Sequence, residues 1–135
     1  MKNKGSRTER ELLHMFFDNG WSALRCAGSG NTTELSTDLI AGKNGRVLAI
    51  ECKSGRREIR RYLQKEQIDG LKEFSKTFGA EAWIGMRYDN EDWLFLEPKH
   101  LNKSKNGTLC VDLKLAKKKG ILFEELIGKF KQRRL

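Results

Sequence analysis

The chain has 135 residues, of which 38% are hydrophobic and 33% charged, a balance typical of one globular domain. No apolar run approaches the roughly 18 residues of a transmembrane helix, and the N-terminus lacks the apolar core of a signal peptide, so we expect an intracellular protein without membrane contact. Lysine and arginine number 27 against 18 aspartates and glutamates, a net charge of +9. Such an excess favours a polyanionic partner such as nucleic acid, although a basic solvated surface would give the same count.

The first half of the chain predicts a helix followed by strands. Residues 6–19 carry apolar side chains at helical spacing. Residues 21–29 alternate partly and fit an edge strand, and the small polar residues 28–37 are typical of a loop. Residues 38–55 predict a β-hairpin, because apolar runs flank a tight turn at Asn44-Gly45.

The second half predicts another helix and another hairpin. Residues 64–78 follow a basic connector over 55–64 and again carry an apolar stripe at helical spacing. The runs 82–88 and 93–97 flank a polar turn and predict a hairpin. A polar loop, a short strand and a short helix are expected over 99–108, 109–115 and 121–130.

This order of elements indicates a single mixed α/β (α+β) domain over residues 1–135, with a central mixed β-sheet and one helix on each face. The polar ends, residues 1–5 and 131–135, are expected to be flexible. The three cysteines lack the spacing of a zinc site, so we expect reduced thiols.

Three charged residues interrupt the first hairpin, where aliphatic residues would be expected. Asp38 stands at its start, and Glu51 and Lys53 stand at the end of its second strand. Side chains alternate along a strand, so Glu51 and Lys53 project from the same face. The turn should bring Asp38 back towards Glu51, and the pairing register is the step on which this depends.

Two carboxylates beside an ammonium suit the hydrolysis of a phosphate ester. Hard divalent cations such as Mg²⁺ take oxygen ligands, activate water and stabilise charge on a phosphate. A neighbouring lysine can orient the water or stabilise the transition state. The alternative is a surface ion pair of Glu51 with Lys53 and a turn-capping Asp38. The apolar run before Glu51 and the upstream aspartate favour the catalytic interpretation.

Glu9 is a further candidate on the first helix. It precedes Leu12 and Phe16 by three and seven residues, so it lies on the inward stripe and can reach a site beneath the helix. The alternative is structural, because Ser6-Arg7-Thr8-Glu9 matches a capping box in which Glu9 bonds back to the Ser6 amide. The pattern alone leaves both roles open.

Together these residues resemble a known family. Asp38, separated by twelve residues from Glu51-Cys52-Lys53, is similar to the motif of PD-(D/E)XK nucleases. The segments KGSRTERELL, RCAGSG, IECKS and LKEFSKTFGAEAWIGMRY are similar to those of archaeal Holliday junction resolvases. The triad occurs in many nucleases, but its combination with the opening helix and the downstream helix and strand is specific. The likeness runs from about residue 4 to residue 97.

The resemblance implies a restriction-endonuclease-like fold and a metal-dependent endonuclease that resolves four-way DNA junctions by paired nicks. It implies Mg²⁺, for which Mn²⁺ can substitute, held by Asp38, Glu51 and the backbone carbonyl of Cys52. Glu9 would complete the site directly or through water, and Lys53 would be the catalytic lysine. One departure is Thr37, which stands where the motif has proline. We expect the change to be tolerated, since threonine suits an extended backbone.

The resemblance also implies contacts with DNA and with a second subunit. Arg10 and Arg25 are expected near the phosphate, and Ser29 in the Gly-Ser loop is expected against the DNA strand. The family acts as homodimers in which each subunit cuts one strand, within the cytoplasm or nucleoid. By spacing, Phe74 and Phe78 are more typical of a core, whereas the resemblance places their helix near the dimer interface.

The arginine-rich stretch RREIRR directly follows the predicted catalytic strand. Arg56, Arg57 and Arg60 are placed to hold the phosphates of duplex arms, although a charge run is usually a solvated surface. Arg87 is a weaker candidate for the same role. Two alternative functions remain: another PD-(D/E)XK nuclease, restriction-like or nicking, and a basic DNA-binding module without catalysis.

Overall fold

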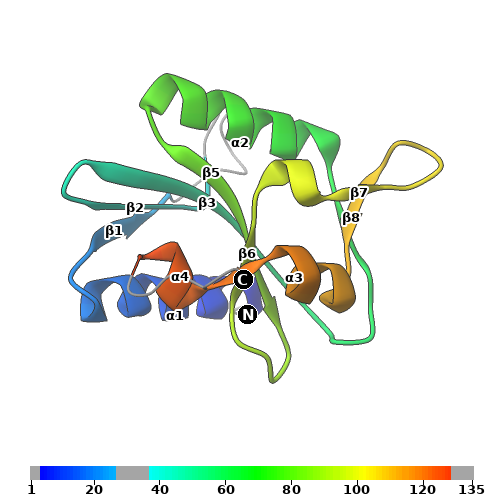
Figure 1. Ribbon diagram of the computed structural model, residues 1–135, viewed down its shortest axis with the longest axis horizontal. Helices are drawn as coiled ribbons and strands as arrows, with labels where there is room; N and C mark the ends of the chain where they lie inside the picture. Colours follow the sequence, from blue (N-terminus) through cyan, green and yellow to red (C-terminus); the bar gives the residue numbers. More distant parts are fainter. Residues whose placement is uncertain (1–3, 27–36, 129–135) are drawn as a thin grey trace, which may run out of the picture.

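The computed structural model describes residues 4–26 and 37–128, which form a central mixed sheet between helices (Figure 1). The strand order is β1 (Ser22–Arg25), β2 (Leu39–Lys43), β3 (Arg46–Gly55), β5 (Glu81–Tyr88), β6 (Leu94–Leu96) and β9 (Ile121–Leu122). β3 is an inner strand that pairs with β2 antiparallel and with β5 parallel, whereas the other pairs in this sheet are antiparallel.

Two long helices cover opposite faces of the sheet. α1 (Lys4–Asp18) and α2 (Lys65–Phe78) lie on either side of it in Figure 1. α2 ends at Gly79, whose φ of 82° is left-handed and favours glycine. These helices confirm the elements predicted over 6–19 and 64–78, and the mixed α/β architecture is confirmed with them.

Two apolar clusters fill the space between the sheet and the two helices. Leu48 and Ile50 of β3 pack with Phe16 of α1 on one face. Ala49, between them in sequence, packs with Leu71 of α2 on the other. The alternation predicted along this strand is therefore confirmed, and both faces of β3 are buried up to the point where its polar residues begin.

The predicted basic connector and the following loop contain short strands. β4 (Arg61–Leu63) pairs with β8 (Leu109–Val111), which pairs in turn with β7 (Asn102–Lys103). These strands form a second sheet of three strands in the described part of the chain. The loop predicted over 99–108 also contains the end of the 3₁₀-helix η2 (Pro98–His100).

Two predictions for the C-terminal third are corrected. The strand predicted over 109–115 is wrong beyond Val111, because Asp112 caps helix α3 (Leu113–Lys119) by accepting the Leu115 N–H. The helix predicted over 121–130 begins with β9, and α4 (Phe123–Leu126) is one turn long. Lys4 and Gly5 belong to α1, whereas the remaining residues predicted as flexible ends lie outside the described ranges. Among the described residues, no helix is long and apolar enough to cross a membrane.

Candidate active site

The β2–β3 hairpin sets the geometry of the predicted site. Its turn has positive φ at both Asn44 (48°) and Gly45 (88°), as in a two-residue turn whose twist matches that of the flanking strands. The resulting register pairs Leu39 with Ile50. A slip of one residue would turn every later side chain to the opposite face, so this turn decides which residues meet at the open end of the hairpin.

Asp38 is held against the end of β3 by two hydrogen bonds. The Cys52 N–H donates to Asp38 Oδ2 at 2.9 Å, and the Thr37 hydroxyl donates to the Ile50 carbonyl at 2.8 Å. Thr37 is buried, so its hydroxyl fastens the segment at the position where the motif has proline. The predicted proximity of Asp38 to Glu51 is confirmed, whereas the loop before residue 37 lies outside the described residues.

Asp38, which is half-buried, and Glu51, which is buried, form a pair of neighbouring acids. Burial raises the pKa of both carboxyls, and for Glu51 the charge of Asp38 adds to burial and brings its pKa to about 8. For Asp38 the Cys52 N–H and then Lys53 oppose the rise in pKa. The pair therefore holds a proton near neutral pH when no cation is bound, which is the behaviour of two like charges forced together.

Lys53 lies beside this pair. Its Nζ is 3.8 Å from Glu51 Oε2 and donates to Gln67 Oε1 at 3.1 Å. The side chain of Lys53 is only 14% exposed, so its ammonium is directed into the site instead of into solvent. The side-by-side projection of Glu51 and Lys53 predicted from strand alternation is confirmed.

Glu9 reaches the same site from α1. Its Oε1 accepts from Arg25 Nε at 3.2 Å and from Arg25 Nη2 at 3.0 Å, and Arg25 Nη2 also donates to Ser6 Oγ. The capping box is wrong, because α1 already includes Lys4 and Gly5 and the Glu9 carboxylate is bound by Arg25. Burial raises the pKa of Glu9, and the hydrogen bond from Arg25 opposes the rise.

These residues surround one open cavity of about 450 Å³. Its carboxylates come from α1, from the segment before β2 and from β3. The lining residues are Gly5, Ser6, Glu9, Arg25, Asp38, Glu51, Cys52, Lys53, Ser54, Arg61 and Gln67.

The donor set fits a hard divalent cation. Asp38 and Glu51 offer carboxylate oxygens, and their mutual repulsion would be relieved by a positive ion. Within residues 4–26 and 37–128, no three side chains of His, Cys, Asp or Glu are grouped to hold a metal ion. A backbone carbonyl, as predicted at Cys52, or Glu9 after its release from Arg25 could add a further oxygen ligand.

The stability of the metal-free protein is expected to fall as pH rises from about 4.5 to about 8. The unfolded chain releases the Glu51 proton near its ordinary pKa of 4.5, whereas the folded protein keeps it to about 8. The contribution of Glu51 to stability is therefore complete below pH 4.5, and it is lost at up to about 1.4 kcal/mol per pH unit between there and about pH 8. Urea unfolding in a chelator at several pH values measures this, and Glu51→Gln should flatten the slope. An equal slope in the variant would contradict the assignment.

Comparison with known proteins identifies the family. A family model described as archaeal Holliday junction resolvase (hjc) matches residues 1–135. The chain belongs to this family. A crossover junction endodeoxyribonuclease Hjc of Methanocaldococcus jannaschii is 38% identical over 129 residues, covering 96% of this chain and 90% of that protein. The Hjc of Archaeoglobus fulgidus is 34% identical over 134 residues, covering 95% of this chain and 98% of that protein.

A solved structure supports the same assignment for the fold. The structure of Archaeoglobus fulgidus Hjc, described as a Holliday junction resolvase from an archaeal hyperthermophile, matches with a TM-score of 0.83 and 30% sequence identity. The match covers 92% of this chain and the whole of that chain. The fold and the family expected from the sequence are therefore confirmed together.

The DNA contacts predicted for this Hjc-family chain lie in different surroundings. Arg25 lines the cavity, and Arg10 donates to Ser6 Oγ at its edge. Arg56 pairs with Glu58 at 3.2 Å on an exposed turn, while Ser29 lies outside the described residues. Whether these side chains touch DNA stays a prediction.

The arginine-rich turn is anchored to the rest of the molecule. Arg57 pairs with Glu91 at 2.8 Å, and Lys117 of α3 approaches the other oxygen of that carboxylate at 3.3 Å. Arg60 is exposed and has no ion-pair partner in the described part of the chain.

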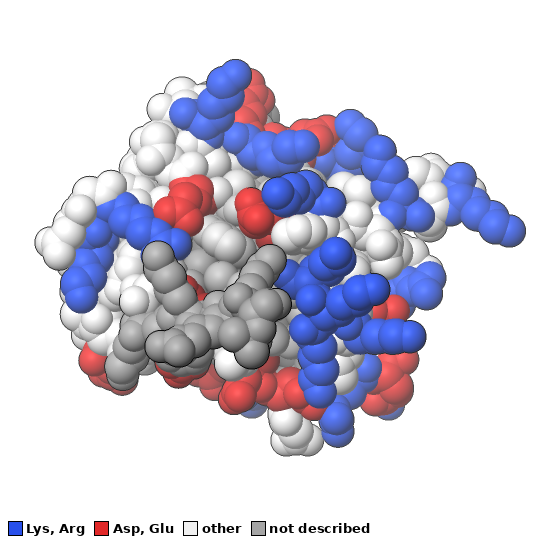
Figure 2. All heavy atoms as spheres, in the orientation of Figure 1, with Lys and Arg blue, Asp and Glu red and all other residues white. Residues whose placement is uncertain are grey.

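Figure 2 shows that lysines and arginines gather on the half of the visible face that carries α3 and the β7–β8 hairpin. The exposed lysines of α3 and the β7–β8 hairpin are Lys103, Lys105, Lys114, Lys117, Lys118 and Lys119.

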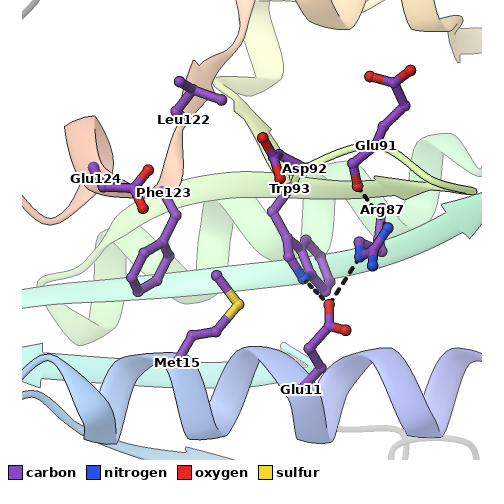
Figure 3. Close-up of a pocket in the computed structure, with 9 residues that line it drawn as sticks. All are labelled: Glu11, Met15, Arg87, Glu91, Asp92, Trp93, Leu122, Phe123 and Glu124. Atoms are coloured by element: carbon purple, nitrogen blue, oxygen red, sulfur yellow. Dashed lines mark hydrogen bonds and ion pairs between the residues drawn. The ribbon is translucent and has the colours of Figure 1, made fainter.

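The guanidinium of Arg87 is occupied by hydrogen bonds within the protein. Its Nε donates to Glu11 Oε1 at 2.8 Å, and its Nη1 donates to the carbonyls of Tyr88 and Glu91. The same oxygen of Glu11 accepts from Trp93 Nε1 at 2.7 Å, beside a second cavity of about 280 Å³ (Figure 3). These bonds tie α1 to the end of β5, so they favour a structural role over the predicted DNA contact, which stays untested.

Phe74 and Phe78 form a stacked pair on α2, with ring centroids 5.2 Å apart. Phe78 is 55% exposed, so the expectation that both belong to a core is not met at this position. Their place in a dimer interface stays a prediction.

Sequence reasoning missed Gln67 as a cavity residue, and it included Arg61 only as part of the arginine-rich stretch. Both lie after the catalytic strand, on the first turn of α2 and on β4, and only the tertiary fold returns them to Lys53. Lys53 and Gln67 are fourteen residues apart in different elements, so neither helical nor strand periodicity in the sequence indicates their contact.

Proposed function

We propose that this chain is a structure-selective endonuclease that resolves four-way DNA junctions by hydrolysing phosphodiester bonds in paired nicks. The observation that carries the proposal is the meeting of Asp38, Glu51 and Lys53 in one cavity, at the positions of the PD-(D/E)XK motif. Membership of the archaeal Holliday junction resolvase family supports the junction as the substrate.

We propose Mg²⁺ as the cofactor, with Mn²⁺ as a substitute, held by Asp38, Glu51 and the Cys52 carbonyl. When bound, such an ion supplies Lewis-acid activation of water and charge stabilisation at phosphorus. Glu9 would join the ligands directly or through water once Arg25 turns to the substrate. Glu51 is only 7% exposed and already lies beside Asp38. The free energy needed to bring the two carboxylates together is therefore supplied by folding, before any ligand binds.

The remaining side chains of the cavity would act on the phosphodiester. In the reaction a water oxygen forms a bond to phosphorus, the bond to the 3′ oxygen breaks, and that oxygen takes up a proton. The Lys53 ammonium is placed to stabilise the extra negative charge on the phosphate or to orient the water. Arg25 forms the rim beside Glu9, where its guanidinium can hold a phosphate by two parallel hydrogen bonds.

The substrate's symmetry supports a homodimer. Two identical subunits related by a two-fold axis would present two equal sites to a junction with opposed strands. The face covered by α2 has exposed apolar side chains suited to such contact: Phe78 on α2 and Leu24 on β1, which is 58% exposed. The register from Leu24 through Ile40 to Ala49 places Leu24 on this same face.

Cleavage of a synthetic four-way junction tests the proposal against its alternatives. We expect Mg²⁺-dependent nicks on opposed strands of the junction, and little cleavage of linear duplex of the same sequence. Cleavage of linear duplex at a fixed sequence would point to a restriction-like nuclease. Junction binding without cleavage at any Mg²⁺ or Mn²⁺ concentration would point to a non-catalytic DNA-binding module.

A further inference from the structure

Gln67 is the residue of α2 that reaches the catalytic cavity. Its Oε1 accepts a hydrogen bond from Lys53 Nζ at 3.1 Å, and its side chain lines the cavity together with the acids. We infer that Gln67 is a positioning residue that orients the Lys53 ammonium for phosphodiester hydrolysis. The inference rests on the proposed nuclease function and adds a residue outside the catalytic motif.

The chemistry of the contact fixes which atoms meet. A lysine ammonium has three donors and no acceptor, so the amide oxygen of Gln67 must face it. Among the described residues the nearest carboxylate oxygen to Nζ is Glu51 Oε2, which at 3.8 Å lies outside hydrogen-bond distance. Of the two contacts, the one to Gln67 is the hydrogen bond, and it alone has the directionality to hold the ammonium.

A fixed support makes this hydrogen bond useful. Lys53 has a long side chain with high rotamer entropy, so its position in a cavity depends on what anchors its end. Gln67 stands in the first turn of α2, where its N–H donates to the Gln64 carbonyl, and the next residue, Ile68, is 2% exposed in the core. The anchor therefore belongs to a helix that is itself held by packing.

The neutrality of Gln67 also matters. Glu51 would turn its oxygens to a cation in the active protein, which leaves Gln67 as the anchor of Lys53. An amide holds the ammonium without cancelling its charge, so the full positive charge stays available for the phosphate. A carboxylate at this place would hold Lys53 but would add negative charge where the substrate's phosphate must bind.

Substitution by methionine tests the inference, because methionine is unbranched, similar in length and lacks a strong acceptor. Gln64→Met is the matched control. Gln64 is the exposed residue before α2, its side chain makes no capping hydrogen bond, and it does not line the cavity. Full-length proteins are compared in single-turnover cleavage of a labelled four-way junction with Mg²⁺, in steady-state cleavage and in junction binding without metal.

We expect Gln67→Met to lower the single-turnover rate and kcat about tenfold. KM and the junction Kd should stay within about twofold of wild type, and the melting temperature within a few degrees. Gln64→Met should match wild type throughout. An NMR order parameter for the Lys53 Cε methylene should fall in Gln67→Met and return to the wild-type value in Gln67→Glu, which restores an acceptor.

The outcomes distinguish failure of the positioning role of Gln67 from failure of the proposed nuclease function. If wild type cleaves the junction but Gln67→Met cleaves at the same rate, or if the Lys53 order parameter is unchanged, the positioning role is overturned. A rate loss accompanied by equal loss of binding or melting temperature would likewise replace it with a structural role. If wild type itself does not cleave junctions with Mg²⁺, the proposed function fails, and the order parameter still reports whether Gln67 holds Lys53.

Discussion

Glu51→Gln is expected to abolish junction cleavage while leaving junction binding intact. The substitution keeps the size of a side chain that is 7% exposed, but it removes a charge that the proposed cation needs. We expect the single-turnover rate to fall about a thousandfold or more, because both cation binding and water activation depend on this carboxylate. Binding, measured by fluorescence anisotropy in a chelator near neutral pH, should be unchanged, because Glu51 already holds a proton there when no cation is bound and its replacement by glutamine removes no charge.

Glu73→Gln is the matched control for this experiment. Glu73 is an exposed residue of α2 outside the catalytic cavity, and the same change there should leave cleavage and binding unchanged. Cleavage by Glu51→Gln at the wild-type rate would remove Glu51 from the catalytic machinery. Loss of binding with an unchanged melting temperature would instead assign Glu51 to DNA recognition.

The proximity of Asp38, Glu51 and Lys53 could be predicted because it depends on local geometry. The Asn44-Gly45 turn fixes the hairpin register, and strand alternation fixes which side chains share a face. Asp38, Glu51 and Lys53 follow from these two rules without any knowledge of the tertiary fold. Glu9 required more, since the helical stripe gave its direction but could not show that Arg25 occupies its carboxylate.

The less predictable parts depend on contacts that are distant in sequence. β4 has three residues and exists as a strand only because β8 pairs with it some fifty positions later. Local composition there is basic and polar, which predicts a connector. Likewise, the run around residue 112 has strand-like alternation, but the Asp112 side chain caps a helix and the capping bond outweighs weak β propensity.

The protonation of the carboxyls in the site could not be predicted from the sequence either. The pKa of Glu51 rises because β3 is covered on both faces and Asp38 returns beside it, and both conditions are products of the fold. Thr37 is a similar case. Its identity indicates only that an extended backbone is tolerated, whereas the structure shows its hydroxyl fastened to the Ile50 carbonyl on the neighbouring strand.

Phe78→Glu is expected to convert the proposed dimer into monomers and to uncouple the two nicks. Phe78 is 55% exposed and stacks on Phe74, so a charge there should not disturb the core but would be costly in an apolar contact between subunits. Sedimentation velocity should show monomers at concentrations where wild type is dimeric. On a supercoiled plasmid with one extruded cruciform, wild type should give linear product from paired nicks, whereas the variant should accumulate nicked circles.

Phe17→Glu provides the comparison that makes this result specific. Phe17 is 51% exposed on α1, which covers the opposite face of the sheet, so the two substitutions add the same charge at similar exposure. Dimers and linear product should persist in Phe17→Glu. If both variants remain dimeric, the subunits meet elsewhere, and if Phe17→Glu alone dissociates, the interface lies on the face of α1. Paired nicking by a monomeric Phe78→Glu would separate strand coupling from dimerisation and would overturn the symmetric two-site model.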